Sequence, residues 1–134
     1  MRTIRFRGRD SNGEWHYGDL EHSPVGKFCR IHEYWDNGIY KGQVDVDPET
    51  VGQFTGLCDL HGKEVYEGDI VRFRVSDNRY KRNPRYITKT IRYDNRLARF
   101  EADGIFWINL SSDRIEVVGN IHDDKNLLEK GGHQ

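Results

Sequence analysis

The chain has 134 residues, of which 35% are hydrophobic and 32% are charged, and its formal net charge is −1. This length suits one compact domain or two small lobes that share a core, because domains commonly contain about 100 to 150 residues. No apolar run approaches the roughly 18 residues that a membrane-spanning helix needs, and the amino terminus lacks the hydrophobic stretch of a signal peptide. We therefore expect a cytoplasmic protein that does not enter a membrane.

The apolar side chains predict a mainly β fold with little helix. Seven Tyr, six Phe and three Trp residues stand against a single Met, and aromatic residues favour strands. The two cysteines, Cys29 and Cys58, are too few for a disulfide framework, so we expect them to be buried thiols in a reducing compartment.

The first 48 residues are predicted to form an N-terminal β half. Apolar and charged residues alternate there with the period of two that is typical of strands. Strands are expected over 4–7, 14–20, 28–35 and 43–46, with 39–40 as an alternative to the last. The first two form a hairpin, and Asn37-Gly38 is a strong signal for another hairpin turn.

Pro48 marks the predicted boundary, because its ring pushes Asp47 into an extended conformation. Residues 49–121 are then predicted to form a C-terminal half with an SH3-like five-stranded barrel, the two halves sharing one core. Its strands are expected over 69–75, 86–93, 96–101, 104–108 and 115–118. Residues 122–134 form a tail, which is expected to be a short helix or a docked extended arm.

Charge is distributed unevenly along the chain. Residues 72–99 contain ten basic and two acidic residues, a local net charge of +8, whereas the rest contains 11 basic and 20 acidic residues, a net charge of −9. Such polarity can steer a protein onto an anionic partner, or the basic face of one protomer onto the acidic face of another. Alternatively, the long cationic side chains only cover the solvated face and edge of a sheet.

Enzyme motifs are missing from the sequence. It has no Gly-rich phosphate loop, nucleophile elbow, zinc-protease helix or CxxC pair. Two further arrangements could carry chemistry: Cys58 with His61 as a thiol-imidazole pair, and the carboxylate pairs Asp45/Asp47 and Glu67/Asp69 as magnesium ligands. A turn would position Cys58 and His61 only loosely, and turn capping and edge protection explain Glu67 and Asp69 without a metal. We therefore expect no catalytic residues, no metal site and no cofactor.

A basic loop over 76–85 is the candidate nucleic-acid site. Phosphates attract cationic side chains, and an aromatic ring in the loop can stack on an unpaired base. The candidate contact residues are Arg79, Tyr80, Lys81, Arg82 and Arg85.

The competing hypothesis is an assembly or adaptor module. Acidic surfaces of the N-terminal half would meet the basic loop of a neighbouring protomer, and aromatic side chains would form the interface core. The candidate interface aromatics are Trp15, Tyr17, Tyr34 and Trp35.

Four segments resemble the YopX-like family of bacteriophages and prophages. They are IRFR at 4–7, the hairpin over 13–20, the segment over 50–71 and IEVVGNI at 115–121. The resemblance implies a mostly β, self-associating protein in the cytoplasm of a bacterial host, and it carries over no catalytic residue. The sequence therefore favours a non-enzymatic interaction or homo-oligomeric assembly module, with nucleic-acid binding through the basic loop as the alternative.

Overall fold

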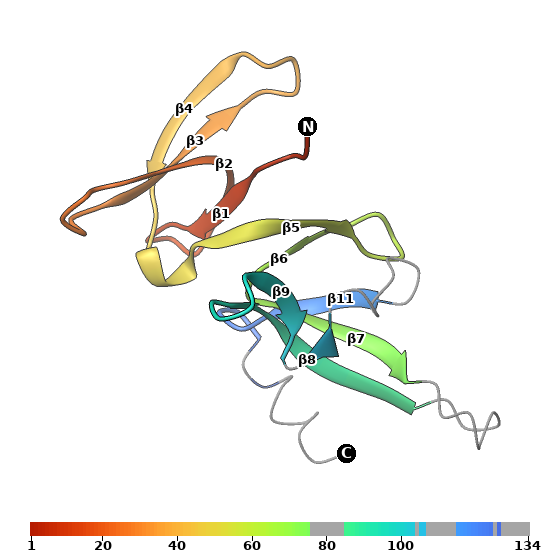
Figure 1. Ribbon diagram of the computed structural model, residues 1–134. Helices are drawn as coiled ribbons and strands as arrows, with labels where there is room; N and C mark the ends of the chain where they lie inside the picture. Colours follow the sequence, from red (N-terminus) through yellow and green to blue (C-terminus); the bar gives the residue numbers. More distant parts are fainter. Residues whose placement is uncertain (76–84, 104, 107–114, 125, 127–134) are drawn as a thin grey trace. The chain divides into compact units, whose positions relative to one another are not determined.

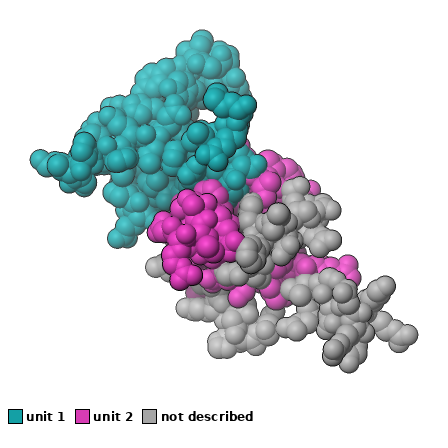
Figure 2. All heavy atoms as spheres, in the orientation of Figure 1, with its two compact units in different colours: residues 1–56 teal, residues 57–134 magenta. Residues whose placement is uncertain are grey.

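The structure is a computed structural model, and it describes residues 1–75, 85–103, 105–106, 115–124 and 126. Within these residues the chain consists of antiparallel β-strands and one short 3-10 helix (Figure 1). The predicted mainly β fold class is confirmed. The chain divides into two compact units, residues 1–56 and residues 57–134 (Figure 2).

The strands of the first unit belong to a six-stranded antiparallel sheet with the order β4-β3-β2-β1-β5-β6, whose last strand is β6 (Glu64–Tyr66). The other five are β1 (Phe6–Arg9), β2 (Trp15–His22), β3 (Cys29–Tyr34), β4 (Tyr40–Asp45) and β5 (Gly52–Cys58). The four predicted strands of the N-terminal half are present, although β4 begins earlier than expected. The 3-10 helix η1 (Pro48–Thr50) lies where the sequence predicts the boundary, and the Asp47 carboxylate caps it by accepting the Glu49 amide.

Short turns join the strands of the first unit because the sequence supplies a carboxylate or a glycine where each turn needs one. Between β1 and β2, Oδ1 of Asp10 accepts the amides of Asn12 and Glu14 at 2.8 and 2.9 Å. Between β3 and β4, Gly38 has a φ of 85° and donates its amide to the Trp35 carbonyl at 2.8 Å. The predicted Asn-Gly turn is confirmed.

One side of this sheet packs around Ile31 in β3, which is fully buried. Its cross-strand partners are Leu20 in β2 and Val44 in β4. Gly18 of β2 lies so close to β3 that a Cβ atom there would overlap the carbonyl oxygen of His32. Because successive side chains of a strand point to opposite faces, the residues that alternate with Ile31 form the other face of the sheet.

The second unit contains a five-stranded antiparallel sheet with the order β10-β9-β8-β7-β11. Its strands are β7 (Asp69–Val75), β8 (Arg85–Asp94), β9 (Arg99–Ala102), β10 (Ile105–Phe106) and β11 (Ile115–Asn120), and the short strand β6 (Glu64–Tyr66) precedes them. The buried hydrophobic cluster of this unit consists of Val65, Val71, Phe73, Ile91, Ala102 and Ile115.

The SH3-like barrel is not confirmed. Strands β7 to β11, as far as the structure describes them, form an open sheet with β10 and β11 at its two edges. The strand predicted over 96–101 begins only at Arg99, because the Asp94 carboxylate accepts the amides of Arg96 and Leu97 and holds a turn before it. The tail beyond Asp124 lies almost wholly outside the described residues.

A buried carboxylate ties the β5–β6 turn to β11. Asp59 is only 5% exposed. Its Oδ1 accepts the amides of His61 and Lys63, each at 2.9 Å, while Oδ2 accepts the amide of Val117 at 3.0 Å. Burial acts to raise the pKa of Asp59, but the three amides outweigh it and leave this pKa below its ordinary value. The turn at 59–62 is therefore also a long-range structural link.

Candidate functional site

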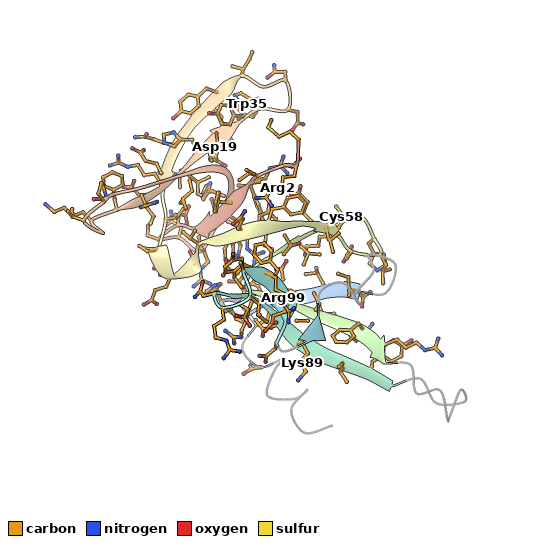
Figure 3. All side chains as sticks on the ribbon, in the orientation of Figure 1. Arg2, Asp19, Trp35, Cys58, Lys89 and Arg99 are labelled. Atoms are coloured by element: carbon orange, nitrogen blue, oxygen red, sulfur yellow. The ribbon has the colours of Figure 1, made fainter. Side chains whose placement is uncertain are left out.

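Large apolar side chains gather, exposed, at the end of the first unit that carries the β3–β4 turn. Tyr17 is 45% exposed, Tyr34 49%, Trp35 55%, Ile39 61% and Tyr40 50%. We call these five residues the aromatic surface. Figure 3 marks its position with the label on Trp35. Contiguous exposed apolar side chains mark interaction sites more often than isolated ones do.

The β3–β4 hairpin fixes the geometry of the aromatic surface. Tyr34 and Tyr40 are cross-strand partners just after a register shift between Glu33 and Tyr34. Their ring centroids are 5.5 Å apart and their planes meet at 67°, the edge-to-face arrangement that aromatic pairs prefer. The Tyr40 hydroxyl is hydrogen-bonded to Nδ1 of His32 at 2.9 Å. The surface is therefore held in shape by its own sheet.

A cleft of about 530 Å³ lies beside the aromatic surface. Tyr17, Tyr34 and Trp35 line it together with the carboxylates Asp19 and Asp36. Asp19 lies in the same lining as Tyr34, and partial burial together with the nearby negative charge of Asp19 raises the pKa of Tyr34 above its ordinary value. The cleft thus combines aromatic faces with negative charge.

Cations of the first unit already lie against its aromatic faces. Nζ of Lys41 lies 4.7 Å from the centroid of the Trp35 ring. The Arg7 guanidinium lies 4.6 Å from the centroid of the Trp15 ring. These distances fall within the range of about 6 Å over which a cation is attracted to an aromatic ring. Trp15 is only partly exposed beneath its arginine, unlike the other predicted interface aromatics.

His16 lies between two carboxylates in the first unit. Its Nε2 is 2.8 Å from Asp10 Oδ2, and its Nδ1 is 3.2 Å from Glu33 Oε1. Burial acts to lower the pKa of His16, but the two carboxylates outweigh it and raise this pKa above 6.5. The hydrogen bond from His16 is the main cause that lowers the pKa of Asp10.

The same cluster has the composition of a metal site. Ligand-type atoms of Asp10, Glu14 and His16 lie within 4.8 Å of one another. No metal site is predicted from the sequence, and this group, whose members face each other across the β1–β2 turn, was missed there. Asp10 caps that turn through the amide of Glu14, so turn formation and the ion pair with His16 account for the arrangement.

The other candidate ligands have structural partners. Nε2 of His61 is hydrogen-bonded to Glu116 at 2.9 Å. Asp45 is paired with Arg30 at 2.8 Å, and Asp69 accepts the amide of Tyr66 at 2.7 Å. Cys29 and Cys58 are free thiols that are partly rather than fully buried.

The basic loop falls mostly outside the described residues. Arg79, Tyr80, Lys81 and Arg82 belong to the segment that the structure leaves out, and Arg85 is placed only by its backbone, as the first residue of β8. On the adjoining strands, Arg74 and Tyr86 are exposed cross-strand partners.

Several other cations of the basic stretch have carboxylate partners. Arg72 is paired with Glu116 at 2.6 Å, Arg99 with Glu101 at 3.5 Å, and Arg92 lies 3.9 Å from Asp103. These pairs fit the interpretation of a solvated sheet face. The structure thus assembles three of the four predicted interface aromatics and adds Ile39 and Tyr40, which sequence reasoning left out.

These observations define a small antiparallel β protein of two compact units, the first of which carries an exposed aromatic surface. Residues 5–129 match the family described as YopX protein. The chain belongs to the YopX family, as its sequence motifs predict.

The crystal structure of protein EF1440 from Enterococcus faecalis is similar to this chain, with a TM-score of 0.56 and 22% sequence identity. The match covers 96% of this chain and 99% of that chain. At this identity the likeness concerns the fold alone. No curated protein matches the chain. Among the described residues, no helix has the length and apolar character needed to cross a membrane.

Proposed function

We propose that this YopX protein is a non-enzymatic interaction module that self-associates through its aromatic surface in the bacterial cytoplasm. The observation that carries the proposal is the gathering of Tyr17, Tyr34, Trp35, Ile39 and Tyr40 at one end of the first unit, each with close to half or more of its surface exposed. Tyr and Trp are enriched in protein interfaces, and a few such residues provide most of the binding energy.

The ordering of the aromatic surface supports the proposal. Tyr34 and Tyr40 are held edge-to-face, and His32 lies against Tyr40 with 5.9 Å between ring centroids. A preformed surface loses little conformational freedom on binding, which favours association. Burial of exposed apolar surface contributes a favourable free energy of about 25 cal/mol for each Å² removed from water.

The charge polarity of the chain also supports self-association. Residues 72–99 have a net charge of +8 and the remaining residues a net charge of −9. A chain that carries both signs in separate segments offers each copy a complementary surface on the next copy. The ionisable clusters around His16 in the first unit and Asp59 in the second take part in ion pairs and turn hydrogen bonds, which agrees with a non-catalytic role.

Sedimentation velocity tests the proposal. Trp35→Ala and Tyr40→Ala remove rings of the aromatic surface and are each expected to raise the dissociation constant of self-association about tenfold or more, since interface hot spots contribute about 2 kcal/mol. Val25→Ala is the matched control, because Val25 is 73% exposed in the same unit but lies in the β2–β3 turn. A wild-type chain that stays monomeric, or variants that associate like wild type, would refute the proposal.

Nucleic-acid binding is the second candidate function. Arg74 and Tyr86 are exposed partners on β7 and β8, and the Arg72 guanidinium lies 5.6 Å from the centroid of the Tyr86 ring. Proteins bind single-stranded nucleic acids with cationic side chains that attract the phosphates and exposed aromatic rings that stack on the bases.

Fluorescence anisotropy with labelled single-stranded DNA, duplex DNA and RNA across a salt series tests this second function. Arg79→Glu/Arg82→Glu and Arg74→Glu are expected to weaken binding and to flatten its salt dependence by about one unit of slope for each lost phosphate contact. Equal binding by wild type and both variants, or no binding at low salt, would rule it out.

A further inference from the structure

The cleft beside the aromatic surface has the chemistry of a cation-binding site. Tyr17, Tyr34 and Trp35 contribute rings, and Asp19 and Asp36 contribute carboxylates, around a volume of about 530 Å³. Volumes of roughly 300–1,000 Å³ are usual for sites that enclose a small group. The cleft is therefore large enough for a side chain and the backbone that carries it.

The charge of the lining also favours a cation. Arg5 is the basic residue among the residues that line the cleft, and with Asp19 and Asp36 it leaves a formal charge of −1. Nζ of Lys41 lies 4.7 Å from the centroid of the Trp35 ring, within the range over which an aromatic ring attracts a cation. Aromatic faces and carboxylates together attract a cation more strongly than either group alone, because ring quadrupole and full charge act in the same direction.

Among biological cations, the guanidinium of arginine fits this lining best. It is planar, so it stacks on Tyr and Trp rings, and it pairs with a carboxylate through two parallel hydrogen bonds. An ammonium group is more strongly hydrated and is a point charge, so it gains less from the same surroundings. The cleft should thus prefer arginine to lysine.

The basic strands of the same protein supply such side chains. Arg74 of β7 is exposed, and it belongs to the stretch over 72–99 whose net charge is +8. Its neighbour Arg72 is engaged with Glu116 at 2.6 Å, so Arg74 is the better donor of the two. Charge complementarity between the cleft and this stretch therefore points to a second copy of the chain as the occupant.

We propose that the cleft binds an arginine side chain of β7 from a second copy, with Arg74 as the residue that enters and Asp19 and Asp36 as its carboxylate partners. The inference rests on the proposed self-association and names its contact. The contact joins two different surfaces, so each copy has a free cleft and a free arginine, and the assembly is a ring or an open chain rather than a symmetric pair.

A charge exchange tests the contact by sedimentation velocity. Asp36→Arg and Arg74→Asp are each expected to raise the dissociation constant of self-association about tenfold or more, because like charges then meet. Mixed in equal amounts, the two variants again offer opposite charges at every contact, and association is expected to return to within about threefold of wild type. Far-ultraviolet circular dichroism and the melting temperature of each variant check that it is folded.

Asp36→Asn, which removes the charge and keeps the shape, is the milder companion variant. It should weaken association by less than Asp36→Arg does. If wild type associates and Trp35→Ala prevents association, but the charge variants behave like wild type or their mixture shows no recovery, the arginine contact is overturned and the proposed function stands. A monomeric wild type overturns both.

Discussion

Tyr34 and Tyr40 meet edge-to-face across the β3–β4 hairpin, with ring centroids 5.5 Å apart, while Tyr34 also lines the cleft together with Asp19 of the neighbouring strand β2. Partial burial raises the pKa of Tyr34, and the Asp19 carboxylate raises it further by opposing a second negative charge. Tyr34 therefore belongs both to the aromatic surface, through its contact with Tyr40, and to the negatively charged lining of the cleft.

Asp19→Asn is expected to lower the pKa of Tyr34 toward 10, because the negative charge beside the hydroxyl is removed while the shape is kept. Carbon-13 NMR of labelled tyrosine rings, titrated from pH 8 upward, measures this pKa directly. Asp45→Asn serves as the control, since Asp45 is paired with Arg30 instead. An unchanged Tyr34 titration in Asp19→Asn would contradict the assigned interaction.

The His16 cluster is expected to make stability depend on pH near neutrality. The pKa of His16 is raised in the folded chain by Asp10 and Glu33, against burial, so its contribution is fully present below the unfolded pKa of 6.5. The contribution is lost as the pH rises through the folded pKa. The carboxylates that face the His16 imidazole are those of Asp10 and Glu33, and the Glu14 carboxylate belongs to the same cluster.

Urea unfolding at pH 5.5 and at pH 8.5 measures the His16 effect. His16→Gln is expected to lower the free energy of unfolding by about 1–2 kcal/mol at the lower pH and by less at the higher pH, because only the protonated imidazole forms charged hydrogen bonds. His22→Gln is the matched control on the same strand, at an exposed position. A loss that is equal at both values would contradict the charged pairing.

Asp59 is expected to make a large contribution to the stability of the second unit. Asp59→Asn keeps Oδ1 for the amides of His61 and Lys63 but turns an NH2 group toward the amide of Val117, so two donors oppose each other. Leaving such a buried donor without an acceptor costs about 1–3 kcal/mol.

Urea unfolding at pH 7 measures the cost of Asp59→Asn, with Asp45→Asn as a control because its ion pair is exposed and worth under about 1 kcal/mol. In wild type, the pKa of Asp59 is lowered on folding, so the stabilisation is present above 3.8 and is lost as the pH falls through the folded value. Equal effects of the two substitutions would show that the amides do not depend on Asp59.

Gly18 and Gly13 are subject to different constraints: there is no room for a Cβ atom at Gly18, and the backbone has a positive φ at Gly13. Gly18→Ala would place a Cβ atom against the His32 carbonyl, whereas Gly13→Ala meets open space and only strains a turn with a φ of 84°. We expect a loss of at least about 3 kcal/mol for Gly18→Ala and of about 1 kcal/mol for Gly13→Ala. Thermal unfolding of the two variants checks the order, which a larger loss at Gly13 would reverse.

The hairpins and strand positions could be predicted because their signals are local. Asn37-Gly38 specifies its own turn, and the alternation over 69–75 specifies a strand wherever that strand is paired. The open sheet of the second unit could not be predicted in the same way. A period of two gives the faces of a strand, but not which strand lies beside it or whether the sheet closes.

For the candidate site too, the residue types could be named from the sequence, whereas their exposure and their contacts depend on the folded structure. Tyr34 and Trp35 were named from the sequence as interface aromatics, but aromatic residues occur both in cores and on surfaces, so only the structure could show that they are exposed. His16 meets Glu33 from another strand, a contact set by the register of β2 and β3. The positions of His16 and Glu33 in the sequence do not indicate that these two residues are in contact.

Hydroxyl-radical footprinting as a function of protein concentration tests most directly whether the aromatic surface is the interface. We predict that oxidation of Tyr34, Trp35 and Tyr40 falls as the chain associates, while oxidation of Leu97, which is 50% exposed in the second unit, stays constant. Equal oxidation of the three aromatic residues at all concentrations would contradict the account.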